Sequence, residues 1–159
     1  MKSVYDDEKQ LLKDLWSDIE EVLMDEVLDR VREIEIEHIE EDVYSVYQPS
    51  IYRRRKKNGG LSDPENIIGT IEGEMQLVVE NITTFNEEYG GSNSGIGLAE
   101  MVNDGGNYLH DYDYGFRSIE APYSKPRPFL DNTIEEIENT NSVENTLANG
   151  LRKRKYDVI

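Results

Sequence analysis

Apolar residues recur every three or four positions along the first third of the chain, and charged residues fill the positions between them. The apolar positions are Leu12, Leu15, Trp16, Ile19, Leu23, Val27, Val31 and Ile34, continuing through Ile39, Val43 and Tyr47. This period predicts an amphipathic helix over about residues 6–46, before Pro49, which disfavours helix at the preceding residue. Such a helix is about 60 Å long. We therefore expect a break or bend near Glu35–His38, or an oligomer in which one end packs on a neighbour.

The pattern changes beyond residue 57. Asn58-Gly59-Gly60 and Ser62-Asp63-Pro64 are typical of turns. The next stretch, Ile67–Thr84, is rich in β-branched residues and predicts strands, with Gly73 at a hairpin turn or bulge. Alternation within it assigns Met75, Leu77 and Val79 to one face of a strand and Gln76, Val78 and Glu80 to the other.

The second half of the chain mixes loops with two short helical patterns. A short helix is expected over 97–104, ended by Gly105-Gly106. A last helix is expected over about 128–148, with a capping box available at Asn132 or Thr133 and a stop at Asn149-Gly150. Residues 85–97 and the tyrosine-rich stretch 107–123 are expected to be loops. The basic tail, 152–159, is expected to add an edge strand or to remain a tail.

These elements predict an α+β fold in a single domain over residues 1–159, with the long helix at 6–46, strands and loops at 51–125 and the C-terminal helix at 128–148. The chain has no cysteine, which excludes disulfides and thiolate metal sites. It shows neither the apolar core of a signal peptide at its start nor an apolar run long enough for a membrane span. We expect a soluble protein made in the cytosol, with no membrane partner.

The net charge of −17 is unevenly distributed. Residues 1–47 hold 16 acids and 5 bases, residues 48–57 hold 5 bases, residues 58–151 hold 17 acids and 3 bases, and the last eight hold 4 bases and 1 acid. This acidic body argues against an ordinary DNA-binding module, which needs a broad basic face. It fits a solubilising surface, the lining of a channel through which DNA slides, or a surface that imitates DNA.

No catalytic constellation is recognisable. His110, Asp111 and Asp113 form a local cluster of metal-ligand types, but their spacing is not that of a calcium loop, and solvated turn residues explain them better. His38 is expected to be charge-paired or exposed rather than a general base. The sequence contains no phosphate loop, nucleophile elbow or zinc motif. We therefore predict a protein that is not an enzyme and that holds no cofactor or metal.

The candidate site is a basic segment flanked by tyrosines. Its residues are Arg53, Arg54, Arg55, Lys56 and Lys57, with Tyr44, Tyr47 and Tyr52 around them. The bases form either a solvated loop or a contact with an acidic partner, which could be a neighbouring copy of this acidic chain. The tyrosines either line that interface or pack against the sheet. Opposite charge patches on one molecule favour head-to-tail contacts, which close into rings when the rotation permits.

Three motifs resemble a known family. The chain reads VYSVYQPSIYRRRKKNGGLSDPENI over Val43–Ile67, then LAEMVNDGGNY over Leu98–Tyr108, then RPFLDNT over Arg127–Thr133. Their order is similar to that in tail-completion or head-tail connector proteins of tailed bacteriophages, the neck and tail-terminator-like minor structural proteins. The tyrosine-rich stretch 107–123 departs from that pattern, which leaves open whether the protein is a tail terminator, a connector or another virion protein.

The resemblance implies a twisted antiparallel sheet packed against the long N-terminal helix and a C-terminal helix. It implies a virion protein at the head-proximal end of the tail, forming a ring of its own copies against tail-tube and neck or connector proteins. Genomic DNA would pass through an acidic lumen without specific binding. The loop 85–97 would become ordered on assembly. The alternative that the charge leaves open is an acidic inhibitor that imitates DNA toward a host nucleic-acid-binding defence protein.

Overall fold

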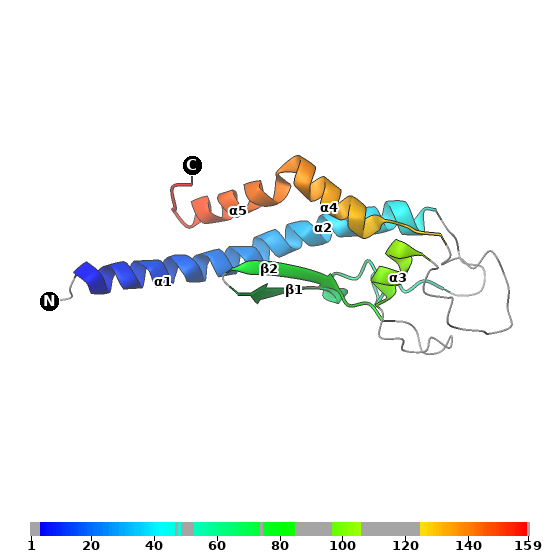
Figure 1. Cartoon of the computed structure of the whole chain (residues 1–159), viewed down its shortest axis with the longest axis horizontal. Helices are drawn as coiled ribbons and strands as arrows, with labels where there is room; N and C mark the ends of the chain where they lie inside the picture. The colour runs from blue at the N-terminus through cyan, green and yellow to red at the C-terminus, as the bar shows by residue number, and fades with distance from the viewer. Residues whose placement is uncertain are drawn as a thin grey trace.

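The longest element of the molecule is one N-terminal helix, against which the other elements pack. The computed structural model describes residues 4–46, 48, 53–73, 75–84, 97–105 and 125–158. Four consecutive segments, α1 (Val4–Val22), η1 (Leu23–Val27), α2 (Leu28–His38) and η2 (Ile39–Tyr44), continue one another as a rod (Figure 1). At about 1.5 Å per residue the rod is about 60 Å long. The predicted N-terminal helix is therefore confirmed, and its observed length agrees with the length expected from the sequence.

Helix α2 runs through Glu35–His38, so the helix has no break at these residues. The other alternative, an oligomer in which one end packs on a neighbour, stays a prediction. The irregularities are instead two π-helical segments, η1 and η2. Apolar residues spaced by four drift across a helix of 3.6 residues per turn, and a π turn, with its wider i to i+5 bonding, absorbs that drift. Ile39 and Val43 consequently both face the core, at 0% and 2% exposed.

A two-stranded antiparallel hairpin packs along one side of the rod. Strands β1 (Ile67–Glu72) and β2 (Gln76–Asn81) pair in the register Ile67 with Asn81 through Glu72 with Gln76. Gly73, with φ 52°, makes the turn, as predicted. A short 3-10 turn, η3 (Pro64–Asn66), leads into β1. Gly69 brings the sheet against the rod, since a Cβ there would lie 2.8 Å from Leu28 Cδ2.

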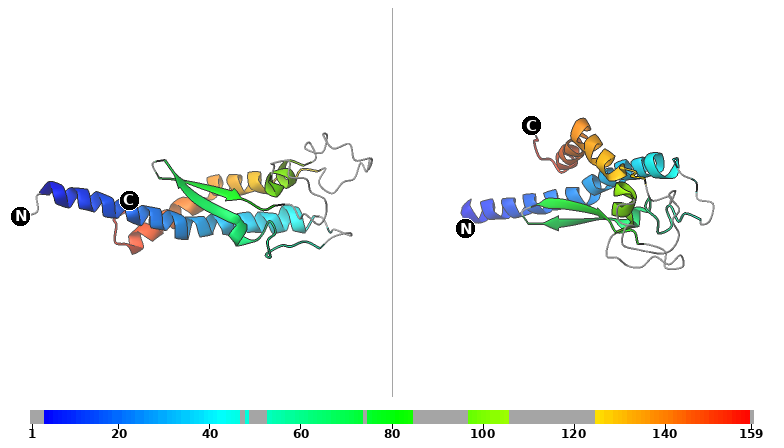
Figure 2. Two further views of the ribbon diagram at one scale, coloured as in Figure 1. Left: turned by 90° about the horizontal axis from the view of Figure 1, so that it is seen from below. Right: turned by 45° about the vertical axis from the view of Figure 1, so that its right-hand side comes forward.

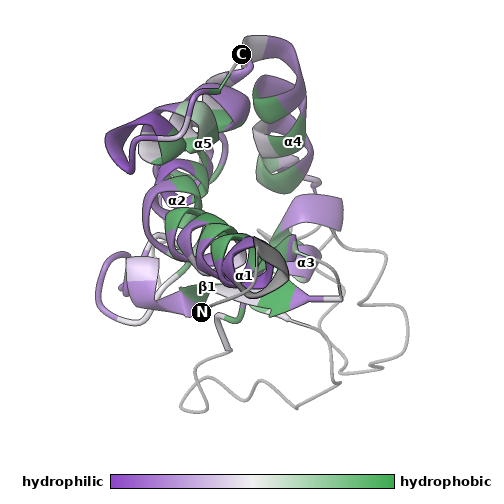
Figure 3. Cartoon of the chain, turned by 90° about the vertical axis from the view of Figure 1, so that its left-hand side faces the viewer, coloured by the Kyte–Doolittle hydropathy of each residue, from purple (hydrophilic) through white to green (hydrophobic). Residues whose placement is uncertain are grey.

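The C-terminal part returns along the other side of the rod as two helices, α4 (Phe129–Thr140) and α5 (Ser142–Lys153). Figure 3, viewed from the N-terminal end, shows the rod between these helices and the hairpin, and the views of Figure 2 agree. The prediction of one helix over 128–148 is wrong. The helix is interrupted at Asn141, which adopts the left-handed conformation (φ 50°) that asparagine tolerates better than most residues. The helix then passes through Asn149-Gly150 to Lys153.

The predicted capping box is also wrong, because α4 begins earlier. Asn132 and Thr133 lie inside α4, after Pro128 at the N-cap position. Thr133 Oγ1 donates to the Phe129 carbonyl at 2.7 Å, and Asn132 Nδ2 donates to Asp42 Oδ2 at 2.8 Å. The amide of Asn132 therefore ties α4 to the rod instead of capping the helix.

The apolar core gathers where the C-terminal end of the rod meets α4 and α3 (Leu98–Asp104). Its buried members are Ile39, Val43, Tyr44, Leu61, Ala99, Val102 and Phe129. Helix α3 confirms the short helix predicted over 97–104, and Gly105, with φ 71°, ends it. The class is α+β, as predicted, with the antiparallel sheet on the long N-terminal helix.

Several predicted features lie outside the described residues. They are the loop 85–97 except for Gly97, the tyrosine-rich stretch 107–123 with the cluster His110, Asp111 and Asp113, and the candidate site residues Tyr47 and Tyr52. Residues 154–158 follow α5 without forming a strand. No helix in the described part of the chain has both the length and the apolarity to cross a membrane.

Candidate functional site

The basic segment lies against the C-terminal end of the rod and covers Tyr44. The side chain of Tyr44 is buried, with 5% of the residue exposed. Arg54 Cζ lies 4.9 Å and Lys56 Nζ 5.0 Å from the centroid of its ring, both within cation-π range. Burial is the largest cause that raises the pKa of the Tyr44 phenol, and its oxygen accepts from the Ser62 amide at 3.4 Å. Tyr44 is thus a core residue held under two cations.

Three of the five bases serve the fold of the chain itself. Arg54 donates to the Tyr44 carbonyl at 2.9 Å and to the Val43 carbonyl at 3.3 Å, the last carbonyls of the rod, which have no partner within the helix. Arg55 donates to the Thr84 carbonyl, and Lys56 Nζ lies 3.7 Å from Glu40 Oε2. Cations at a helix C-terminus are also favoured by the helix dipole. These contacts fix the segment 53–57 to the end of the rod.

The remaining two bases, Arg53 and Lys57, are exposed. Val46, two residues beyond Tyr44, is 70% exposed. We call Val46, Arg53 and Lys57 the basic end. The sequence could not separate these side chains from their neighbours, because five consecutive bases look alike until the fold assigns partners to some of them. The interface role of the segment stays a prediction.

The opposite end of the rod carries an exposed apolar surface. Every residue from 7 to 14 is exposed, and Leu11, Leu12 and Trp16 are 62%, 54% and 49% exposed. We call these three residues the α1 stripe. The sequence pattern marked Leu12 and Trp16 as the inner face of an amphipathic helix, but both are about half exposed. The N-terminal end of α1 projects beyond α5 and the hairpin (Figure 1). Whether these side chains are buried depends on how far the neighbouring elements extend along the rod. The apolar period in the sequence does not predict that length.

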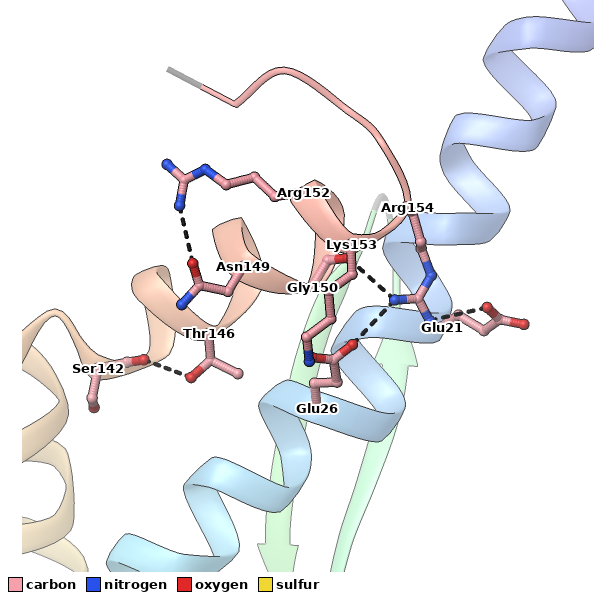
Figure 4. Close-up of polar contacts among 9 residues, drawn as sticks. All are labelled: Glu21, Glu26, Ser142, Thr146, Asn149, Gly150, Arg152, Lys153 and Arg154. Carbon is pink, nitrogen blue, oxygen red and sulfur yellow. Dashed lines mark hydrogen bonds and ion pairs between the residues drawn. The ribbon is translucent and has the colours of Figure 1, made fainter.

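Between these ends, the basic C-terminus is clamped onto the rod (Figure 4). Arg154 forms ion pairs with Glu21 at 3.2 Å and Glu26 at 3.1 Å, and Lys153 Nζ lies 2.7 Å from Glu26 Oε2. The hydrogen bond from Lys153 is the largest cause that lowers the pKa of Glu26, and the bond to Glu21 is the largest that raises the pKa of Arg154. Tyr156 Oη donates to Asp18 Oδ2 at 2.6 Å, which raises the pKa of the phenol. Two of the four bases of the predicted basic tail, Lys153 and Arg154, are therefore paired with acids of the rod.

The described residues offer little that resembles a catalytic site. A shallow depression beside the clamp is lined by Glu26, Thr146, Asn149, Arg152 and Lys153. Its acid and one of its bases already pair with each other. Among the residues the structure describes, no three His, Cys, Asp or Glu side chains gather as a metal site would require. His38 lies between two carboxylates on opposite sides of its ring, with Nε2 3.1 Å from Glu136 Oε2 and Nδ1 3.6 Å from Asp42 Oδ2, so the two acids do not converge on one point.

One buried carboxyl group joins the rod to the hairpin. Glu35 is 3% exposed, and its Oε1 accepts from Asn81 Nδ2 at 2.8 Å. The same Nδ2 donates to the Leu61 carbonyl at 3.0 Å, and Asn81 Oδ1 accepts from Thr83 Oγ1 at 2.6 Å. Burial raises the pKa of Glu35, and the bond from Asn81 only partly offsets that effect. The buried position of Glu35 therefore disfavours the charged form of its carboxyl group.

Replacing Glu35 with glutamine should stabilise the protein at neutral pH, by on the order of 1 kcal/mol. Glutamine keeps an oxygen for Asn81 and removes the buried charge. Because the pKa is raised in the folded state, the penalty disappears as pH falls through the folded pKa toward the unfolded value, and it returns as pH rises. Urea unfolding of Glu35→Gln and wild type from pH 7 to pH 4 should therefore converge at the acidic end. The exposed Glu37→Gln is the control, and a Glu35→Gln less stable than wild type at pH 7 contradicts this explanation.

The described residues form an elongated, acidic α+β fold with exposed side chains at both ends of the rod. The chain belongs to the YomN family, whose sequence model matches residues 7–153. A relative from Bacillus subtilis (strain 168), described as "SPbeta prophage-derived uncharacterized protein YomN", is 32% identical over 101 residues. That match spans 64% of this chain and 59% of the relative, so less than two thirds of the relative's length is covered. No solved structure matches the chain.

Proposed function

We propose that this protein is a non-enzymatic structural component of a phage virion, a ring-forming subunit at the head-proximal end of the tail. In this role it completes the tail and joins it to the head, against tail-tube and neck or connector proteins. Its place is the virion, after synthesis in the host cytoplasm. The prophage origin of the relative supports a phage role, and the order of the three motifs supports the position in the tail.

The observation that carries the proposal is the pair of open surfaces at opposite ends of the rod. The α1 stripe lies on an acidic helix, and the basic end lies about 60 Å away by the length of the helix. A molecule with different, complementary surfaces at its two ends assembles with copies of itself head to tail, and such contacts close into rings. An enzyme or an isolated binding module has no need of this polarity.

The acidic excess fits the same role. Genomic DNA that leaves the head through a ring meets side chains of its own sign, which repel it at long range and keep it from binding. Part of the basic charge is also paired within the chain, with Lys56 on Glu40 and Lys153 and Arg154 on Glu26. The bases paired in this way are less available to DNA.

Immunogold electron microscopy tests this proposal. Antibody raised against the purified chain should label the head-tail junction of particles of the phage that encodes it. A lysate of a phage with the gene deleted serves as the control. It should contain heads and tails that are not joined to each other. Antigen that is abundant in the lysate but absent from intact and disassembled particles would refute the virion role. A pull-down from host extract would then test the DNA-imitating inhibitor, which the net charge of −17 supports.

A further inference from the structure

The α1 stripe is an unusual surface, because it is apolar and flanked by acids. Leu11, Leu12 and Trp16 are each about half exposed or more on a helix that carries seven acids and two bases over residues 4–22, a net charge of −5. Isolated exposed apolar residues are common, but a group of three on one projecting helix marks a contact surface. The partner of this surface must be both apolar and basic.

The molecule already shows how the acidic rod is covered one turn further along. At residues 18–26, α5 and the basic C-terminus cover the rod with an apolar contact at Val22, which is 0% exposed, and with bases on Glu21 and Glu26. Figure 4 shows these bases directed at the two glutamates. The α1 stripe continues this interface toward the N-terminus, where α5 no longer reaches. The same chemistry, a base beside an apolar side chain, is required there.

The basic end provides that chemistry. Residues 53–57 carry five bases and no acid, and three of them, Arg54, Arg55 and Lys56, are held by contacts within the chain. Arg53 and Lys57 are exposed, and Val46 is 70% exposed. The basic end and the α1 stripe lie at opposite ends of the rod (Figure 1), so one molecule cannot join them within itself. A second copy can.

We propose that the α1 stripe of one copy receives the basic end of a second copy. This contact rests on the proposed ring assembly and names the two surfaces that make it. Trp16 and the two leucines are covered around Val46, while Arg53 and Lys57 face the acids of α1, such as Asp14. A symmetric contact between two α1 helices is the less favourable arrangement, because it places a charge of −5 beside another −5.

Two variants, each lacking one surface, test this contact. Leu12→Lys/Trp16→Lys removes the α1 stripe, and Arg53→Glu/Lys57→Glu reverses the basic end. All four positions are exposed, so far-UV circular dichroism should match wild type. By mass photometry and sedimentation at low salt, wild type should form species larger than a dimer. Each variant alone should be monomeric, with self-association at least tenfold weaker.

The mixture of the two variants gives the sharpest result. Each contributes one intact surface, so a 1:1 mixture should form a heterodimer that does not grow further, and 0.5 M salt should dissociate it. Ile134→Lys, an exposed apolar position on α4, and Lys155→Glu are the controls that should assemble like wild type.

Three outcomes would overturn the contact. A monomeric wild type at high concentration and low salt removes it, and the stripe then belongs to another protein. A dimer of Arg53→Glu/Lys57→Glu alone shows that α1 pairs with α1. A 1:1 mixture that stays monomeric shows that the two surfaces do not meet. Immunogold microscopy separates this inference from the proposed function. If the protein is monomeric but labels the head-tail junction, the virion role stands and the contact fails. If the protein self-associates as described but does not label particles, the contact stands and the virion role fails.

Discussion

Replacing Phe129 with alanine should lower the free energy of unfolding by about 3–5 kcal/mol, the usual loss when a fully buried phenylalanine is truncated. Phe129 is 0% exposed and lies in the apolar cluster with Val43, Tyr44 and Val102. It begins α4, and the cluster joins α4, α3 and the end of the rod. Truncation therefore leaves a cavity at the point where three elements meet.

Urea unfolding followed by circular dichroism measures this effect. The control is Ile134→Ala in the same helix, which is 56% exposed and should change the free energy of unfolding by no more than about 0.5 kcal/mol. If Phe129→Ala lost less than about 1 kcal/mol, the cluster would not be the centre of the fold. A Phe129→Ala variant that does not fold would agree with the prediction. Phe129→Leu should retain part of the stability, and its loss in the free energy of unfolding could then be measured instead.

Replacing Gly150 with alanine should also destabilise the protein, by about 1–3 kcal/mol, as expected from overpacking. A Cβ at Gly150 would lie 2.4 Å from Val22 Cγ1 and 3.1 Å from its Cγ2. Val22 is fully buried and its β-branched side chain is stiff, so α5 must move away from the rod. Alanine is the better helix former by up to about 1 kcal/mol, and the clash has to exceed that gain.

A double-mutant cycle tests the mechanism at this contact. Val22→Ala removes both γ methyl groups, so Gly150→Ala should cost much less in the Val22→Ala background than in wild type. Gly97→Ala is the matched control, because a Cβ there meets nothing within 4 Å. Equal losses in both backgrounds would show that the close approach of α5 to the rod is not the cause.

The clamp provides a second readout of the same substitution. If α5 moves away from the rod, Arg154 and Lys153 lose Glu21 and Glu26, whose ion pairs depend on the position of the end of α5 (Figure 4). Exposed ion pairs weaken with salt. The stability of Gly150→Ala should accordingly depend less on salt than that of wild type.

Local patterns in the sequence determined most of the elements. The apolar period predicts the rod to within a few residues at each end, because helix periodicity is a property of neighbouring positions. The hairpin with its turn at Gly73 and the helix ended by Gly105 follow from local backbone preferences in the same way. Boundaries failed where a local signal competed with packing. Gly150 resembles a helix stop, but it lies within α5 because only a residue without a side chain fits against Val22.

The tertiary structure alone decided which side chains are free. Five consecutive bases are equivalent in the sequence, yet the fold assigns Arg54 to the rod's last carbonyls and Lys56 to Glu40 and leaves Arg53 and Lys57 exposed. Leu12 has the same place in the apolar period as the residues that become buried, but it remains 54% exposed because none of the described elements covers it. The physical reason is the same in both cases. Periodicity sets the direction of a side chain, whereas its partner depends on segments far away in the sequence.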